Sequence, residues 1–266
     1  MAIFNMVWGG WWGNELPYLC FTALAVNSTV QLIKTGSPAS VTLETSTDWK
    51  TWTAYTFWNT ITLTNILDKV YWRNTSTTDT WFNTNASNYY KFVMTWSIAW
   101  SWDVNYLLNK NSTNTLSSYC YISLFNGCTS LATAPSLPAT TLAGNCYAYM
   151  FRWCTSLTAT PQLPATTLVD ACYSSMFQWC TNLTALPKLP ATTLPNFCYY
   201  FMFYQCSKIK MSTTQTWEYQ TAYRIPTTWT WTVGSSSLAN MFNSTWWTFT
   251  WTPSINTTYY TSNTVV

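Results

Sequence analysis

The sequence predicts a mixed α/β solenoid, with coils of a short helix and a short strand, preceded by a small all-β, sandwich-like domain. Two observations predict the solenoid: cysteines return every 26 residues, and aromatic and leucine columns keep the same period. A third predicts the β domain, because apolar and polar residues alternate with period two before the repeats. A chain of 266 residues is long enough for both parts.

The repeats start at Cys120 and can be written as four units, 120–145, 146–171, 172–197 and a decaying 198–223. A fixed period of about 20–29 residues with leucines in register is typical of a leucine-rich-repeat solenoid. We expect the recurring side chains to form buried structural ladders. They are Cys120, Cys146, Cys172, Cys198, Cys128, Cys154, Cys180, Cys206, Phe125, Phe151, Phe177, Phe203, Leu131, Leu157 and Leu183.

Each unit has two parts. The pattern C-Y-x-x-M-F-x-x-C places apolar residues at i, i+1, i+4, i+5 and i+8, which predicts one face of a short helix. The following Thr-Ser-Leu-Thr favours a short strand, and the prolines of A-P-x-L-P-A end regular structure. One coil cannot bury its own apolar face, so stacked coils would share a continuous core.

The cysteines raise the alternative of a disulfide or metal framework. In a helix, eight residues rise about 12 Å, which exceeds the roughly 7 Å between Cα atoms that a disulfide tolerates. Equivalent cysteines on adjacent coils would lie about 5 Å apart, within reach of a bridge. We prefer a buried ladder of free thiols, because Cys packs as a small hydrophobe. Cys20 belongs to no pattern, and no zinc-ligand spacing occurs, so we expect no metal and no cofactor.

The rest of the chain divides around the repeats. Alternation at Val30/Leu32, Val41/Leu43, Ile61/Leu63 and Val70/Trp72 predicts the β domain. The expected parts are a leader and glycine-type hinge over 1–15, the β domain over 16–95, the solenoid over 96–223 with an irregular leading coil over 96–119, and an irregular C-terminal capping coil over 224–266.

The composition holds an anomaly, 19 Trp against 7 Gly. Average glycine usage is about 7%, which would give roughly 19 Gly here. The repeat supplies an internal control, because one column holds Gly127, Trp153, Trp179 and Gln205. That column follows the predicted helix, where a left-handed residue, usually glycine, is common. A bulky side chain is strained there.

We interpret these tryptophans as glycines miscoded through UGA, a codon that some bacterial lineages and their phages read as glycine. Trp52 and Trp72 lie at strand-like positions and are expected to be genuine. Asp48-Trp49 would become Asp-Gly, a strong hairpin signal. Glycine is expected at Trp8, Trp11, Trp12, Trp49, Trp58, Trp81, Trp96, Trp100, Trp102, Trp153, Trp179, Trp217, Trp229, Trp231, Trp246, Trp247 and Trp251.

The motifs MF-x-x-CTSLT and P-x-LPATTL, over about 120–210, resemble the BspA-like leucine-rich-repeat surface proteins of bacteria. The stretch Ser46–Arg73 is similar to the β domain that precedes such repeats. That family usually has glycine at the positions of Trp49, Trp58, Trp153 and Trp179, where this chain departs. The resemblance implies surface adhesion or protein recognition without enzymatic activity, and it carries no catalytic residues over.

Composition excludes several functions. The chain has no histidine, which removes His-based triads and His metal sites. Its 11 Lys and Arg are scattered at a net charge of +3, so nucleic-acid binding is not expected. No apolar run is long enough to insert into a membrane, and no signal peptide is recognisable. The eight carboxylates form no close pair beyond Glu44 and Asp48, so we expect no catalytic site.

The sequence therefore favours a non-enzymatic recognition or adhesion protein, which binds a protein or glycan receptor at a bacterial cell surface. One alternative is a phage virion component, such as a tail-fibre or receptor-binding protein; either would act outside the cell. The other is a carbohydrate-binding module, which requires real and exposed tryptophans. Binding residues are not predicted, because exposed positions of repeat surfaces vary.

Overall fold

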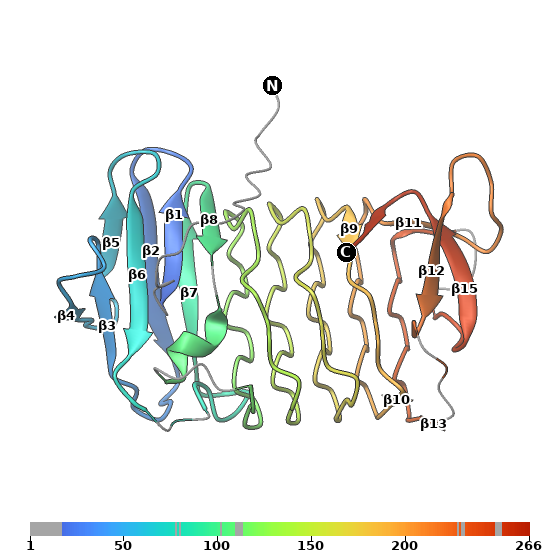
Figure 1. Cartoon of the computed structure of the whole chain (residues 1–266), viewed down its shortest axis with the longest axis horizontal. Coiled ribbons are helices and arrows are strands. Elements are labelled where there is room, and N and C mark those ends of the chain that lie inside the picture. The colour runs from blue at the N-terminus through green and yellow to red at the C-terminus, as the bar shows by residue number, and fades with distance from the viewer. Residues whose placement is uncertain are drawn as a thin grey trace, which may run out of the picture.

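The computed structural model describes residues 18–77, 79, 81–101, 103–109, 114–227, 229, 232–247 and 252–266. The expected leader over 1–15 lies outside these residues. The molecule is elongated: a layered β region forms the N-terminal end, stacked coils form the middle, and a small sheet forms the C-terminal end (Figure 1). Among the described residues, no helix has the length and hydropathy that a membrane crossing needs.

The predicted mixed α/β solenoid, with a short helix in every coil, is wrong. The structure is 2% helical and 29% strand. Within the described residues the one helix is a short 3-10 turn, η1, over Val104–Leu107. It lies outside the repeats, so the fold is almost entirely β and turn.

The first coil shows what replaces the helix. Its backbone is left-handed at every fourth residue, at Tyr119, Ser123 and Gly127, with φ of 62°, 56° and 83°. An α-helix needs negative φ throughout and N–H bonds to residue i−4. Here alternate N–H groups instead donate to residue i−3, and those between them donate to the next coil.

The N–H of Leu124 donates to Tyr121 at 3.2 Å, whereas the N–H of Phe125 donates to Met150 of the next coil at 2.9 Å. The apolar residues at i, i+1, i+4 and i+5 are therefore inward pairs of successive turns. We call this side of the molecule the turn wall; it comprises 119–128, 145–154, 171–180, 197–206 and 236–245.

The opposite side of the coils, the return wall, carries the Thr- and Pro-rich segments. Coils meet there through isolated parallel bridges, such as Thr115 with Thr141 and Ala159 with Ala185. Full strands are short, β9 over Ala185–Leu186 and β10 over Thr193–Leu194. Proline has no N–H and cannot extend a ladder, which limits the strand expected in each coil.

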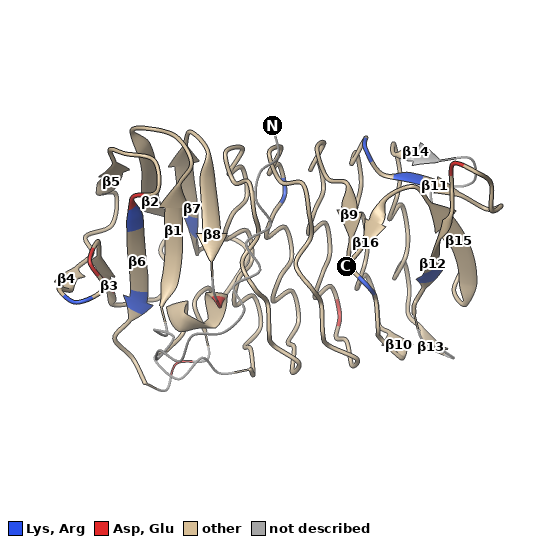
Figure 2. Cartoon of the chain, turned by 45° about the horizontal axis from the view of Figure 1, so that its top comes forward, with Lys and Arg blue, Asp and Glu red and all other residues tan. Residues whose placement is uncertain are grey.

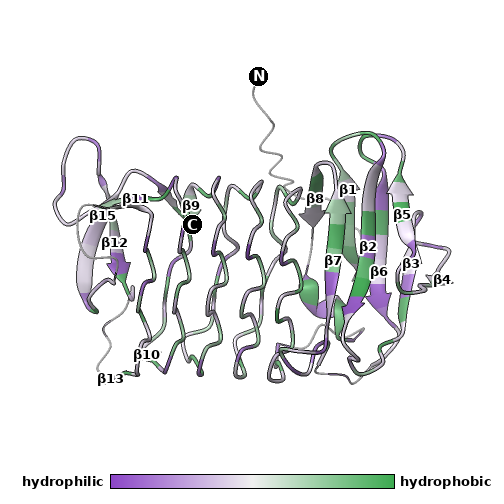
Figure 3. Ribbon diagram, turned by 180° about the vertical axis from the view of Figure 1, so that it is seen from behind, coloured by the Kyte–Doolittle hydropathy of each residue, from purple (hydrophilic) through white to green (hydrophobic). Residues whose placement is uncertain are grey.

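The N-terminal β region has two sheets. Their strands are β1 (Leu19–Ala23), β2 (Ser28–Thr35), β3 (Leu43–Ser46), β4 (Thr53–Ala54), β5 (Thr60–Leu63), β6 (Lys69–Asn74), β7 (Tyr89–Thr95) and β8 (Ile98–Ser101). One sheet has the order β4-β3-β6-β1-β8 and the other β5-β2-β7. Phe21 of β1 packs on Phe92 of β7, with ring centroids 4.9 Å apart, so the two sheets share a core. That core shows as hydrophobic residues on β1, β2 and β7 (Figure 3).

Both sheets continue into the coils. In β7, the N–H of Phe92 donates to Leu124 of the turn wall at 2.8 Å. In β8, Ile98 bridges Leu131 of the return wall. Residues 98–101 therefore belong to a sheet, although the sequence placed them in a leading coil. The first coil covers two sheet edges that would otherwise be open to pairing.

The C-terminal end departs from the 26-residue period after Ile209. Its strands are β11 (Lys210–Ser212), β12 (Thr221–Ile225), β13 (Thr232–Val233), β14 (Trp246–Trp247), β15 (Thr257–Thr261) and β16 (Thr264–Val265). Strands β12-β15-β11-β14 form a sheet, while β13 pairs with β10 and β16 with β9. The last turn wall lies 39 residues after the fourth, as Phe203 stacks on Phe242.

Two aromatic stacks run through the core. Phenylalanine rings lie 5.3–5.6 Å apart from Phe92 through Phe125, Phe151, Phe177 and Phe203 to Phe242. Tyrosine rings at 121, 147, 173 and 199 lie 5.7–6.0 Å apart. The phenylalanine stack links the β region to the last coil without a break.

We expect Phe151→Ala to lower the free energy of unfolding by about 3–5 kcal/mol, because it opens a cavity in the stack and removes ring contacts on both sides. Thr167→Ala, at an exposed position of the same coil, is the control and should change it by less than about 0.5 kcal/mol. Urea denaturation measures both. An equal, small effect of the two variants would contradict the continuous core.

Candidate recognition surface

The predicted ladder residues lie in the core, each with at most 1% exposure. The second cysteine column has a specific bonding role. The Phe125 carbonyl accepts the N–H of Cys128 at 2.9 Å and the thiol of Cys154 at 3.2 Å. The next two coils repeat this pair of bonds at Phe151 and Phe177. A carbonyl has two lone pairs, so the thiol uses an acceptor site that the backbone leaves open.

The burial of the thiols lowers their reactivity. All nine cysteines are free and buried. Burial raises the pKa of Cys128 and of Cys172 to about 12, and it raises the pKa of the other ladder thiols. A thiol is a nucleophile and a metal ligand as the thiolate. Among the described residues, no three His, Cys, Asp or Glu side chains gather as a metal site.

The carboxylate pair singled out in the sequence has structural partners. Glu44 forms an ion pair with Arg73 at 2.6 Å. Asp48 accepts the N–H groups of Thr51 and Lys50 at 2.7 and 2.9 Å. These bonds hold the pKa of the Asp48 carboxyl well below its usual range. Asp48 therefore stabilises the loop between β3 and β4, which pair antiparallel.

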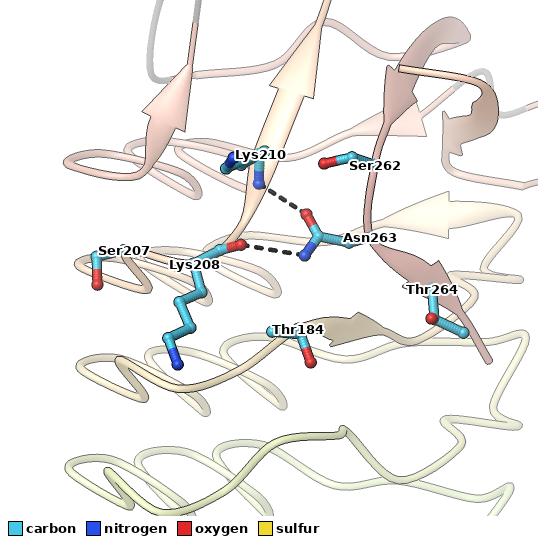
Figure 4. A pocket seen from close by; sticks show the side chains of 7 residues that line it. All are labelled: Thr184, Ser207, Lys208, Lys210, Ser262, Asn263 and Thr264. Atoms are coloured by element: carbon cyan, nitrogen blue, oxygen red, sulfur yellow. Dashed lines mark hydrogen bonds between the residues drawn. The ribbon is translucent and has the colours of Figure 1, made fainter. Parts of the chain in front are cut away.

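A polar hollow lies where the C-terminal strand meets the coils, and Thr184, Ser207, Lys208, Lys210, Ser262, Asn263 and Thr264 line it (Figure 4). Its central side chain, Asn263, accepts the N–H of Lys210 at 2.7 Å and donates to the Lys208 carbonyl at 3.0 Å. The Lys210 ammonium lies 3.6 Å from Glu218. The Asn263 amide therefore fixes the chain that leads into β16, and the Thr184 and Ser207 hydroxyls donate to the carbonyls of Thr158 and Thr181. These polar groups have structural partners.

A second hollow lies on the return wall, lined by Ala134, Pro135, Ser136, Leu137, Pro138, Pro161, Gln162 and Pro164. These residues come from the same segment of two successive coils. The lining carries no charge, and proline offers no side-chain donor or acceptor. The hollow lacks the few convergent polar groups that orient a small ligand.

The outer face of the turn wall, unlike the two hollows, has a row of aromatic side chains. Two residues of every four point inward, and the other two point outward. In the fourth coil, four outward positions are aromatic, and we call them the aromatic ridge: Phe197, Tyr200, Phe201 and Tyr204. Consecutive rings touch, with centroids 5.4, 4.3 and 5.0 Å apart and interplanar angles of 79–85°. Phe197 is 42% exposed.

The ridge is bordered by small or polar outward residues. The same positions are Ala171, Ser174, Ser175 and Gln178 in the third coil, and Ser236, Ala239, Asn240 and Asn243 in the last. Ser174 and Ser175 are buried, whereas the polar residues of the last coil are exposed or partly exposed. The row is extended by Trp179, whose ring lies 5.9 Å from that of Tyr204, and by Trp153, stacked on Trp179 at 4.5 Å. A row of exposed and partly exposed aromatic rings beside polar residues is typical of an interaction site.

The ridge lies in a neutral part of the molecule. Between residues 114 and 209 the charged side chains are Arg152, Asp170, Lys188 and Lys208, and none of them is in the ridge segment 197–206. Charged residues are correspondingly sparse over the coils (Figure 2). The surface therefore suits an uncharged partner better than an acidic or basic one.

The ridge was not predicted from the sequence. The available signal was the run Phe-Cys-Tyr-Tyr-Phe-Met-Phe-Tyr at 197–204. Only the inward half of that run repeats, and the outward half is specific to one coil. A search for recurring columns therefore passes over it.

No protein-family model, curated protein or solved structure matches the chain. The resemblance to BspA-like surface proteins stays a prediction, and its leucine-rich-repeat fold is not what the structure shows.

We expect none of the nine thiols to react with iodoacetamide at pH 8 in the folded protein, because each is buried and protonated. Intact mass spectrometry should show no adduct before urea is added and nine afterwards. Rapid alkylation of the folded chain would show that the ladders are open to solvent.

Stability should fall above pH 9. The thiol pKa is raised in the folded state, so the unfolded chain loses its thiol protons first, and stability present below pH 9 is lost as the pH rises towards about 12. One such thiol contributes up to about 1.4 kcal/mol per pH unit. Urea midpoints at pH 7.5, 9 and 10.5 measure this, and Cys172→Ala should show a shallower decline. A flat profile would contradict it.

Proposed function

We propose that this chain is a non-enzymatic recognition or adhesion protein, which holds a protein or glycan partner at a bacterial surface through the aromatic ridge. The observation that carries the proposal is a row of four touching aromatic rings, of which Phe197 is exposed and the other three are partly exposed. The neighbouring coils have small and polar residues at these positions. Elsewhere on the turn wall, large inward aromatics are buried in the stacks.

The ridge is suited to recognition for two reasons. Aromatic side chains supply a large apolar contact area, and tyrosine adds a polar end that can hydrogen-bond a partner. The backbone that carries the rings is also hydrogen-bonded to the next coil. The N–H groups of Phe201 and Phe203 donate to carbonyls of that coil at 3.1 and 2.8 Å. Little conformational entropy is then lost on binding.

A neutral glycan fits these features well. The C–H faces of sugar rings pack on aromatic faces, and the side chains of Ser236, Asn240 and Asn243 in the last coil can bond to hydroxyl groups. A protein partner with an apolar, uncharged patch would use the same contacts. Either partner depends on the rings themselves.

The test replaces the ridge with the residues of the third coil, Phe197→Ala, Tyr200→Ser and Phe201→Ser together. The chain already accepts these residues one coil away, so the fold should persist. We expect binding to intact bacterial cells and to a glycan array to fall at least 10-fold, as for interface anchors worth more than about 1.4 kcal/mol.

The matched control is Tyr149→Ser, an outward left-handed position two coils away, which should leave binding unchanged. Far-UV circular dichroism and thermal melting verify that both variants fold. Unchanged binding by the folded triple variant would refute the ridge as the recognition surface.

A further inference from the structure

The described tryptophans fall into two groups by backbone conformation. Five have left-handed backbone: Trp49, Trp58, Trp96, Trp153 and Trp179, with φ of 58°, 74°, 58°, 65° and 67°. All five were expected to be glycine from the sequence. Trp52 and Trp72, expected to be genuine, are not in this group.

The side chains of Trp52 and Trp72, the two tryptophans expected to be genuine, pack against neighbouring residues. Trp72 is fully buried and packs on Phe21 and Phe92, at 6.3 and 5.3 Å. The Trp52 ring lies 4.0 Å below the Arg73 guanidinium. In the left-handed group, Trp58 and Trp96 are 56% and 65% exposed. Their indoles contribute little burial, while their backbone adopts a conformation that glycine takes without strain.

The turn wall contains the direct comparison. Gly127, Trp153, Trp179 and Gln205 occupy one column, and all four are left-handed. Left-handed backbone alone does not identify a miscoded codon, because Tyr149 and Phe201 also adopt it. The inference rests on its coincidence with 19 Trp against 7 Gly and with glycine in the same column of the first coil.

We infer that the native protein carries glycine at positions 49, 58, 96, 153 and 179, each decoded from UGA. Trp100, also expected to be glycine from the sequence, is not included in this inference. Its indole is 5% exposed and packs between Phe21 and Phe125, at 4.4 and 4.6 Å, so glycine there would leave a cavity. Among the described residues, Trp217, Trp246 and Trp247 have no left-handed backbone. Trp8, Trp11, Trp12, Trp102, Trp231 and Trp251 lie outside the described residues.

The inference is independent of the proposed function, since the aromatic ridge contains no tryptophan. It changes the surface beside the ridge, because the stacked pair Trp153 and Trp179 would be absent from the native protein. Recognition would then depend on the phenylalanine and tyrosine rings alone. Loss of ridge binding and the identity of these residues are measured separately.

The decisive measurement is peptide mass spectrometry of the protein from its native source. Trypsin releases 153–188, which holds both turn-wall positions, and 51–69, which holds Trp52 and Trp58. We expect glycine at 153 and 179, and in the second peptide tryptophan at 52 but glycine at 58. Tryptophan at 58, 153 or 179, or UGG in the coding DNA there, would overturn the inference.

A second measurement uses the chain that carries tryptophan at these positions. Trp58→Gly and Trp96→Gly should each raise the melting temperature by about 2–4 °C, since backbone strain is relieved. The control Trp72→Gly should lower it, because it empties a buried site. A fall for Trp58→Gly and Trp96→Gly comparable to that of the control would show that these indoles stabilise the fold and would count against glycine there.

Discussion

The structure depends on the alternation of backbone N–H partners along the turn wall. Every second N–H bonds within its own coil, and those between bond to the next coil. This alternation is possible because the backbone turns left-handed at every fourth residue. It gives the two-in, two-out order of side chains, and it places equivalent residues of successive coils directly over one another. The phenylalanine, tyrosine and cysteine columns follow from that superposition.

Much of this order could be predicted from the sequence. The 26-residue period and the inward residues, such as Phe151 and Cys154, follow from recurrence alone. The helix was wrong because apolar residues at i, i+1, i+4 and i+5 satisfy a period of four as well as one of 3.6. Hydrophobic spacing cannot separate the two over nine residues. The ridge was missed for the opposite reason: Phe197 and Phe201 do not recur, and the outward residues differ from coil to coil.

At both ends of the stack, β strands pair with backbone groups of the terminal coil that would otherwise be unpaired. At the N-terminal end, β7 and β8 supply one strand for each wall of the first coil. At the C-terminal end, β16 pairs in parallel with β9, and β13 pairs in parallel with β10, so both strands cover the return wall. Trp100 fills the junction between the sheets and the first coil. Sequence alternation identified strands, but it could not show that two of them extend the coils, because that pairing joins distant segments.

The coils are stacked at a regular spacing, so the position of a coil in the sequence sets its distance from the β region. Adjacent coils are separated by about 4.8 Å, the spacing of hydrogen-bonded strands. The aromatic ridge on the fourth coil therefore stands at a fixed height above the β region. Duplication or loss of one 26-residue unit would move the ridge by one step and leave its chemistry intact. The 39-residue spacing to the last coil shows that extra length can loop out without breaking the stack. The length of the stack and the chemistry of the ridge can thus change separately.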